Sequence, residues 1–187
     1  AQYYLGEIYY EGEFVTLDIN KAIHYLDLSS KNNNSDAQYL LGQIYYEGKY
    51  ISQDINKAIH YLKLSSKQEN SDAQFLLGDI YNDDKYVKKK YYFDHIKYAE
   101  HDVNEAIKYY ELSAEQGNSE ALLEIGLILR NSPYITNDID KAIHFFKMAS
   151  DLDNSEAQFI LGEIYYIGKE TSRDITQSIK YLTLSSK

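Results

Sequence analysis

The five histidines are the residues best suited to bind a metal ion, and their spacing argues against that role. His24, His60 and His144 each follow an aspartate by six residues, so they occupy one recurring position in the chain. Helix packing would place neighbouring recurrences roughly 10 Å apart, whereas metal ligands lie about 2 Å from the ion. His95 and His101 are six residues apart, which is not a helical ligand spacing. The sequence therefore predicts no metal site.

Motifs for catalysis or cofactor binding are also missing from the sequence. It contains no Gly-x-Ser-x-Gly elbow, no P-loop, no dinucleotide fingerprint and no Glu-x-x-His pair. The chain has no cysteine, which excludes a thiol nucleophile, a thiolate metal site and a disulfide. We predict that this segment is not an enzyme and binds no cofactor.

Composition narrows the class of partner. The 187 residues carry a formal net charge of −10 and give a sequence pI of about 4.9. Such a negative field disfavours nucleic acid and anionic membranes as the main partner. The sequence has no run approaching the roughly 20 apolar residues that cross a bilayer, so we expect no membrane insertion. A protein or peptide is the expected partner.

The chain is built from internal repeats. The segment that opens at Ala37 returns at Ala1, Ala73, Ala121 and Ala157, at spacings of 36, 36, 48 and 36 residues. A second signature, Asp54-Ile-Asn-Lys-Ala58, follows in each copy and starts at Asp18, Asp102, Asp138 and Asp174. These periods predict one solenoid with units 1–36, 37–72, 73–120, 121–156 and 157–187. The whole sequence begins at the first-helix alanine of a repeat, without the preceding cap residue or an initiator Met, so we expect a fragment of a longer protein.

Each unit is predicted to form two antiparallel helices. In unit two the first helix has an apolar face at spacings of three and four, formed by Ala37, Leu40, Leu41, Ile44 and Tyr45. The second helix has a matching stripe, formed by Ile55, Ala58, Ile59, Leu62 and Ser65 or Ser66. One hairpin cannot bury both faces, so the units must stack, and their exposed ends can associate with one another.

Helix caps are predicted from polar residues at the helix starts. The recurring aspartates should cap the second helices in all five units. For the first helices the expected caps are serines, namely Ser35, Ser71, Ser119 and Ser155. Three glutamines, Gln38, Gln74 and Gln158, are expected to complete capping boxes.

These residues resemble the Sel-one-like repeat family, a relative of the tetratricopeptide repeats. Unit two carries the family pattern at Ala37, Leu41, Gly42, Tyr45, Gly48, Asp54, Lys57, Ala58 and Tyr61. The family's second turn glycine is replaced by Phe14, Tyr50, Tyr86, Tyr134 and Glu170. The resemblance implies an all-α fold, a right-handed α-solenoid of five antiparallel helix hairpins with a superhelix like that of the tetratricopeptide repeats. It also implies that first helices line the concave surface.

Five glycines recur inside the first helices, namely Gly6, Gly42, Gly78, Gly126 and Gly162. A glycine in a helix interior costs roughly 0.5–1 kcal/mol relative to alanine, so a compensating close contact is expected. We predict that the second helix of the same hairpin crosses at each of them.

An insertion of 12 residues lengthens unit three. It is basic and aromatic, and its central residues are Lys88, Lys89, Lys90, Tyr91, Tyr92 and Phe93. We expect a longer loop or extra N-terminal turns on the second helix, starting at about Phe93. The alternative is a contact element for an acidic partner or for an acidic face of the same chain.

The predicted partner-binding groove is a column of first-helix positions equivalent to 39, 43 and 46. Its members are Tyr3, Glu7, Tyr10, Tyr39, Gln43, Tyr46, Phe75, Asp79, Asn82, Leu123, Leu127, Arg130, Phe159, Glu163 and Tyr166. Aromatic residues followed by acids suit a peptide that carries Arg or Lys between apolar anchors. The alternative is that these tyrosines only cover helix packing.

A non-catalytic scaffold or adaptor for partner proteins is the function that the resemblance and the column imply. Two alternatives stay open: a lumenal or secreted recruiter of misfolded or glycosylated proteins, and the regulatory arm of an enzyme whose catalytic domain lies outside this segment. A cytoplasmic location is favoured over the endoplasmic-reticulum lumen or secretion. Asn33-Asn34-Ser35 is the only glycosylation sequon, and a chance match is the favoured explanation.

Overall fold

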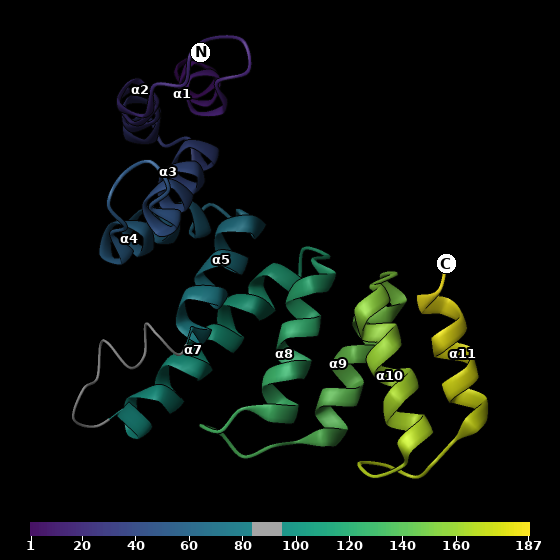
Figure 1. The fold of residues 1–187 in the computed structure, drawn as a ribbon. Coiled ribbons are helices and arrows are strands. Elements are labelled where there is room, and N and C mark those ends of the chain that lie inside the picture. The colour runs from purple at the N-terminus through teal and green to yellow at the C-terminus, as the bar shows by residue number, and fades with distance from the viewer. Residues whose placement is uncertain (84–94) are drawn as a thin grey trace. The chain divides into compact units, whose positions relative to one another are not determined.

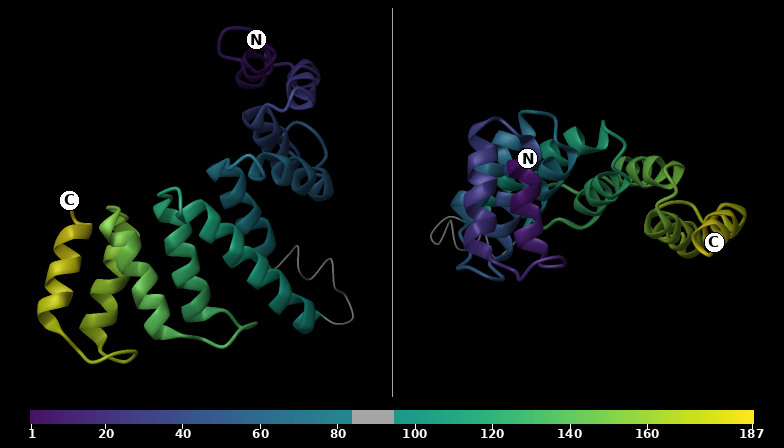
Figure 2. Two further views of the ribbon diagram at one scale, coloured as in Figure 1. Left: turned by 180° about the vertical axis from the view of Figure 1, so that it is seen from behind. Right: turned by 90° about the horizontal axis from the view of Figure 1, so that it is seen from above.

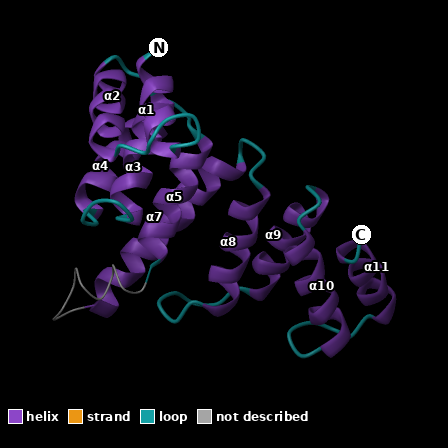
Figure 3. Cartoon of the chain, turned by 45° about the horizontal axis from the view of Figure 1, so that its top comes forward, coloured by secondary structure: helices purple, strands orange, loops and turns teal. Residues whose placement is uncertain are grey.

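The computed structural model describes residues 1–83 and 95–187, with side chains described for 1–83 and 102–187. Ten helices form in these residues and no β-strand occurs among them (Figure 3). The helices are α1 (Gln2–Glu11), α2 (Ile19–Lys31), α3 (Ser35–Glu47), α4 (Ile55–Ser66), α5 (Ser71–Asn82), α7 (His95–Ala114), α8 (Ser119–Asn131), α9 (Ile139–Asp151), α10 (Ser155–Ile167) and α11 (Ile175–Ser185). The chain forms two compact units, Ala1–Leu77 and Gly78–Lys187.

Consecutive helices pair into hairpins, which confirms the predicted all-α solenoid architecture (Figure 1). Helices α1 and α2 and helices α3 and α4 pack together in the first unit, and α2 also packs on α3. In the second unit α8, α9, α10 and α11 lie side by side in chain order (Figure 2). Tyr81 of α5 stacks on Tyr109 of α7, which joins the third hairpin. The second helix of this repeat, α7, begins at His95, whereas the expected start at about Phe93 lies outside the described residues.

Aspartate caps begin the second helices of four hairpins, as predicted. The carboxylate of Asp54 accepts a hydrogen bond from the Lys57 amide at 3.0 Å. The remaining three caps are Asp18, Asp138 and Asp174. The prediction is wrong in unit three, because Asp102 lies inside α7 and is buried. A helix that already starts at His95 leaves no first turn at residue 102 for Asp102 to cap.

The predicted serine caps of the first helices are wrong by one residue. Asn34 is the cap of α3, with backbone angles in the extended region, and its side chain accepts from the Ala37 amide at 2.7 Å. Asn70, Asn118 and Asn154 do the same in later units. Each of the predicted serines (Ser35, Ser71, Ser119 and Ser155) is instead the first helical residue. Asparagine and serine are comparable caps, so their order in the sequence did not decide between them.

The glutamines predicted to close capping boxes have another role. Gln38 is buried and its Nε2 donates to the Ser30 carbonyl at the end of the preceding helix. Gln74 and Gln158 make the equivalent bond to Ser66 and Ser150. These side chains therefore join successive hairpins, because each adds a second hydrogen bond to a helix C-terminal carbonyl that already accepts a backbone N–H from the following turn.

The five first-helix glycines are packing residues, as predicted. A Cβ atom on Gly42 would lie 2.5 Å from Cγ of Leu62 on the partner helix. Equivalent approaches involve Leu26 at Gly6, Tyr110 at Gly78, Phe146 at Gly126 and Leu182 at Gly162. Among the described residues, one apolar core lies around Leu41 and Ile44 in the first unit and another around Phe146 and Leu161 in the second.

Candidate functional site

The described side chains form no cluster of three or more potential metal ligands. His24, His60 and His144 are exposed, and each lies edge-on to the aromatic ring of the next residue. The side chains of His95 and His101 lie outside the described residues. None of the helices in residues 1–83 and 95–187 is long and apolar enough to span a membrane.

The first unit brings the predicted column residues of α1 and α3 together. The hydroxyl of Tyr3 donates to Glu7 at 2.6 Å, and Gln43 donates to Glu47 at 2.7 Å. Tyr10 of α1 links the two helices, because its hydroxyl reaches Glu47 at 3.3 Å. We call this surface the α1–α3 face, formed by Tyr3, Glu7, Tyr10, Tyr39, Gln43, Tyr46 and Glu47. Glu47 was not among the residues predicted from the sequence, although its spacing of four from Gln43 places both residues on one side of α3.

Negative charge that forms no ion pair with the described lysines and arginines is the main electrostatic property of the α1–α3 face. No lysine or arginine of the described residues forms an ion pair with Glu7 or Glu47. Lys49 lies over the Tyr50 ring, 4.9 Å from its centroid, and it attracts Glu47 only from a distance, without an ion pair. Burial, followed by the charge of Glu47, raises the pKa of Tyr10 to about 12. The tyrosine hydroxyls therefore stay protonated as donors to the two carboxylates.

Some other members of the predicted column are engaged within the protein. Asp79 accepts a hydrogen bond from Tyr110 at 2.7 Å, and burial raises the pKa of its carboxyl. Leu123 is only 2% exposed and belongs to the apolar core, so it does not face a groove. Arg130 forms a bidentate pair with Glu170, with its shortest N–O distance at 2.7 Å. At these three positions the side chains are therefore occupied by contacts within the protein.

Helix α10 presents the most open part of the column. Phe159 is 48% exposed, Tyr166 is 58% exposed and Glu163 lies exposed between them. Arg173 lies over the Tyr166 ring, 5.3 Å from its centroid. The rings of Tyr39, Tyr46 and Phe75 are half-buried. The insertion residues Lys88, Lys89, Lys90, Tyr91, Tyr92 and Phe93 lie outside the described residues.

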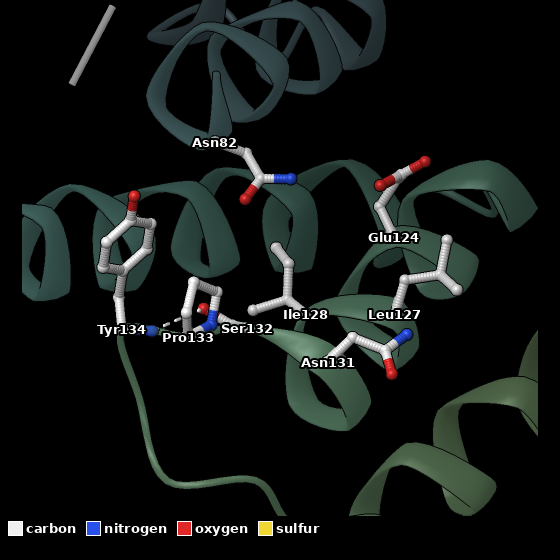
Figure 4. A pocket seen from close by; sticks show the side chains of 8 residues that line it. All are labelled: Asn82, Glu124, Leu127, Ile128, Asn131, Ser132, Pro133 and Tyr134. Carbon is white, nitrogen blue, oxygen red and sulfur yellow. Dashed lines mark hydrogen bonds between the residues drawn. The ribbon is translucent and has the colours of Figure 1, made fainter. Parts of the chain in front are cut away.

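A pocket of about 300 Å³ opens in the second unit (Figure 4). It is lined by Asn82 of α5, by Glu124, Leu127, Ile128 and Asn131 of α8, and by residues 132–134 of the following loop. Two of these residues, Asn82 and Leu127, belong to the predicted column. Glu124 does not, yet it has a sequence signal: it occupies the repeat position held by Tyr4, Leu40, Leu76 and Ile160.

Burial and nearby carboxylates raise the pKa of Glu124. Loss of water contact is the largest cause, and Asp79, Glu156 and Glu120 add repulsion. No hydrogen bond or ion pair forms between Glu124 and another described residue. The pocket therefore combines apolar walls with a carboxylate that has no ion-pair partner among the residues whose side chains are described.

Comparison with known proteins places the repeats in a family. A sequence model of the Sel1 repeat matches residues 1–34, 35–70, 71–118, 119–154 and 155–187. No curated protein matches the chain. A Sel1 repeat protein from Oxalobacter formigenes has a similar structure, with a TM-score of 0.78 and 25% identity, over 99% of this chain and 71% of that one.

Two more distant structures show the same fold. A putative Sel1 repeat protein from Klebsiella pneumoniae is 19% identical, with a TM-score of 0.55, over 99% of this chain and 84% of that chain. The immunity protein Pa5087 from Pseudomonas aeruginosa is 18% identical, with a TM-score of 0.57, over 99% of this chain and 66% of that chain. Because the five matched repeats together span the whole sequence, the chain belongs to the Sel1 repeat family.

Proposed function

We propose that this chain is a non-catalytic scaffold that captures basic peptide segments of partner proteins on its first-helix surfaces. Sel1 repeat proteins are typically protein-interaction scaffolds, which supports the general class. The single observation that carries the finer proposal is the α1–α3 face, where Glu7 and Glu47 have tyrosine and glutamine donors but form no ion pair with any described lysine or arginine.

The chemistry of the face suits a segment with Lys or Arg between apolar side chains. A cation from the partner can pair with Glu7 or Glu47 while keeping the existing donors in place, because a carboxylate accepts several hydrogen bonds. The tyrosine rings offer flat apolar area and can also attract a cation. The net charge of −10 favours basic partners over acidic ones during approach.

A random-peptide display library tests the proposal, with the purified chain as bait. We expect the selected peptides to be enriched in Lys or Arg flanked by apolar residues. Fluorescence anisotropy then compares the affinity of one selected peptide for the wild type and for Glu7→Gln with Glu47→Gln. Glutamine keeps an acceptor for Tyr3 and Tyr10 but loses the charge, so affinity should fall about tenfold.

The matched control is Glu13→Gln with Glu69→Gln, which removes the same charge from two exposed loop residues. Its affinity should stay within about twofold of the wild type. The proposal fails if library selection yields no peptide, if the peptides lack basic residues, or if both double variants weaken binding equally.

The half-buried tyrosines require a separate comparison. Tyr39→Ala with Tyr46→Ala should abolish capture of the same peptide while changing stability little, if the rings contact the partner. A large fall in melting temperature from either single change would show that these rings belong to the core. The contact surface would then be restricted to the acidic residues and Tyr10.

A further inference from the structure

One side-chain position recurs at the junction between consecutive repeats. In the first unit Tyr10 reaches across to the next repeat, where its hydroxyl meets Glu47 and its ring lies 6.2 Å from that of Tyr50. In the fourth repeat, Arg130 holds the same position as Tyr10. It pairs with Glu170 of the fifth repeat, which is the equivalent of Tyr50. A large side chain therefore fills this junction in both cases.

The junction between the third and fourth repeats lacks such a side chain. The recurring position is Asn82 there, and its neighbours across the junction are Asn131 and Tyr134. Because asparagine is much smaller than tyrosine or arginine, the junction is open and forms the pocket of about 300 Å³ (Figure 4). That volume is at the lower limit for small-molecule sites, so it suits one long side chain.

Glu124 gives this open junction its charge. Its repeat position is apolar or aromatic in the other four repeats. Leu40 and Ile160 are buried there, Leu76 is half-buried and Tyr4 is exposed. A half-buried acid costs stability unless it has a partner, and no other described residue supplies one. A departure of this kind from a repeat pattern is expected where a residue serves binding.

We propose that the pocket receives an arginine side chain from the partner peptide, with its guanidinium paired to Glu124. The inference rests on the proposed function and assigns the residue that anchors the peptide in the second unit. Leu127, Ile128 and Pro133 supply apolar area for the methylene stem, and the Asn82 and Asn131 carbonyl oxygens can accept further N–H donors.

The chain itself contains a precedent for this arrangement. Arg130 occupies the next junction and donates to both oxygens of Glu170, at 2.7 and 3.0 Å for the shortest contacts. Arginine is favoured over lysine because its planar group matches a carboxylate with two parallel bonds. The partner's arginine would thus form with Glu124 the same kind of bidentate pair that Arg130 forms with Glu170 within the chain.

NMR shift mapping with a single amino-acid probe tests this anchor apart from the rest of the peptide. The probe is N-acetyl-arginine N-methylamide, and the matched probe is its citrulline analogue, which has nearly the same shape but no charge. Arginine should shift the amide signals of residues 124–131 saturably, and citrulline should bind about tenfold more weakly or not at all.

Glu124→Gln should reduce the arginine affinity about tenfold, whereas the exposed control Glu115→Gln should leave it unchanged. Glu124→Leu, which restores the apolar residue of the other repeats, should abolish the shifts and raise the urea midpoint. Higher stability in that variant excludes misfolding as the cause of lost binding.

Equal binding of arginine and citrulline, or unchanged binding in Glu124→Gln, would overturn the inference. Stronger binding of the matching lysine or norleucine probe would overturn the choice of arginine. In each of these cases the proposed function would stand if library peptides still bound the α1–α3 face in a manner dependent on Glu7 and Glu47.

Discussion

Replacing Gly42 by alanine tests whether the repeat is held together by the close approach of its two helices. The new methyl group would lie 2.5 Å from Cγ and 2.7 Å from Cδ2 of Leu62, whereas carbon atoms in contact are normally about 3.5–4.0 Å apart. Leu62 is fully buried, so it must move by about 1 Å within a packed core.

Two opposing effects decide the sign of the change. Alanine stabilises a helix interior by about 0.5–1 kcal/mol relative to glycine, while overpacking a core costs about 1–3 kcal/mol. We expect a net loss of about 0.5–2 kcal/mol. For a chain of this size the melting temperature should fall by about 1–8 °C.

Urea denaturation followed by circular dichroism measures the change, with a double-mutant cycle as its control. Leu62→Ala alone should cost about 2–5 kcal/mol because it leaves a cavity beside Gly42. In the double variant the methyl at position 42 enters that cavity, so the two effects should fall short of additivity by at least about 1 kcal/mol. A Gly42→Ala variant that is more stable than the wild type would refute the packing argument.

Three further predictions follow from the caps and the junctions between repeats. Asn34→Ala should lower the free energy of unfolding by about 1 kcal/mol in urea titrations, whereas Ser35→Ala should change it by less than about 0.5 kcal/mol. Equal effects of the two substitutions would contradict the assignment of Asn34 as the cap. Gln38→Leu should cost about 1 kcal/mol in the same assay, because it removes the bond to the Ser30 carbonyl, and an unchanged midpoint would show that this bond contributes nothing. Hydrogen bonding from the Lys141 amide lowers the pKa of Asp138, so the charged cap stabilises the fold above its ordinary pKa of about 3.9 and loses that effect as the pH falls through the lowered value. The asparagine introduced by Asp138→Asn still caps the helix without titrating, so the wild type should lose its advantage over this variant as the pH falls from about 5 through the lowered pKa of Asp138; a constant difference would contradict the assignment.

The elements were predictable because their determinants lie close together in sequence. Apolar spacing, the second-helix aspartates and the first-helix glycines are local patterns that repeat, and each recurrence checked the others. The choice between Asn34 and Ser35 was not predictable, because both residue types cap helices and only the backbone angles decide. The predicted cap at Asp102 was wrong for a different reason, because the helix that contains Asp102 begins seven residues earlier, at His95.

The candidate site was less predictable because it depends on side chains from neighbouring repeats. Spacing alone placed Leu123 and Tyr3 on one column, yet packing buries the first and leaves the second beside Glu7. The pocket is open because Asn82 is small, and it is acidic because of Glu124. These two residues belong to different repeats. Comparing repeats position by position reveals that acid, but only the structure shows the space beside it.

Site-specific photo-cross-linking tests the central claim most directly, because it reports where a bound peptide lies. A benzoylphenylalanine would replace Gln43 on the α1–α3 face in one variant and His60, which is exposed on α4, in the other. With a library-selected basic peptide, we predict a cross-link from position 43 and none from position 60. A cross-link from position 60 without one from position 43 would contradict the assignment of the first helices as the binding surface.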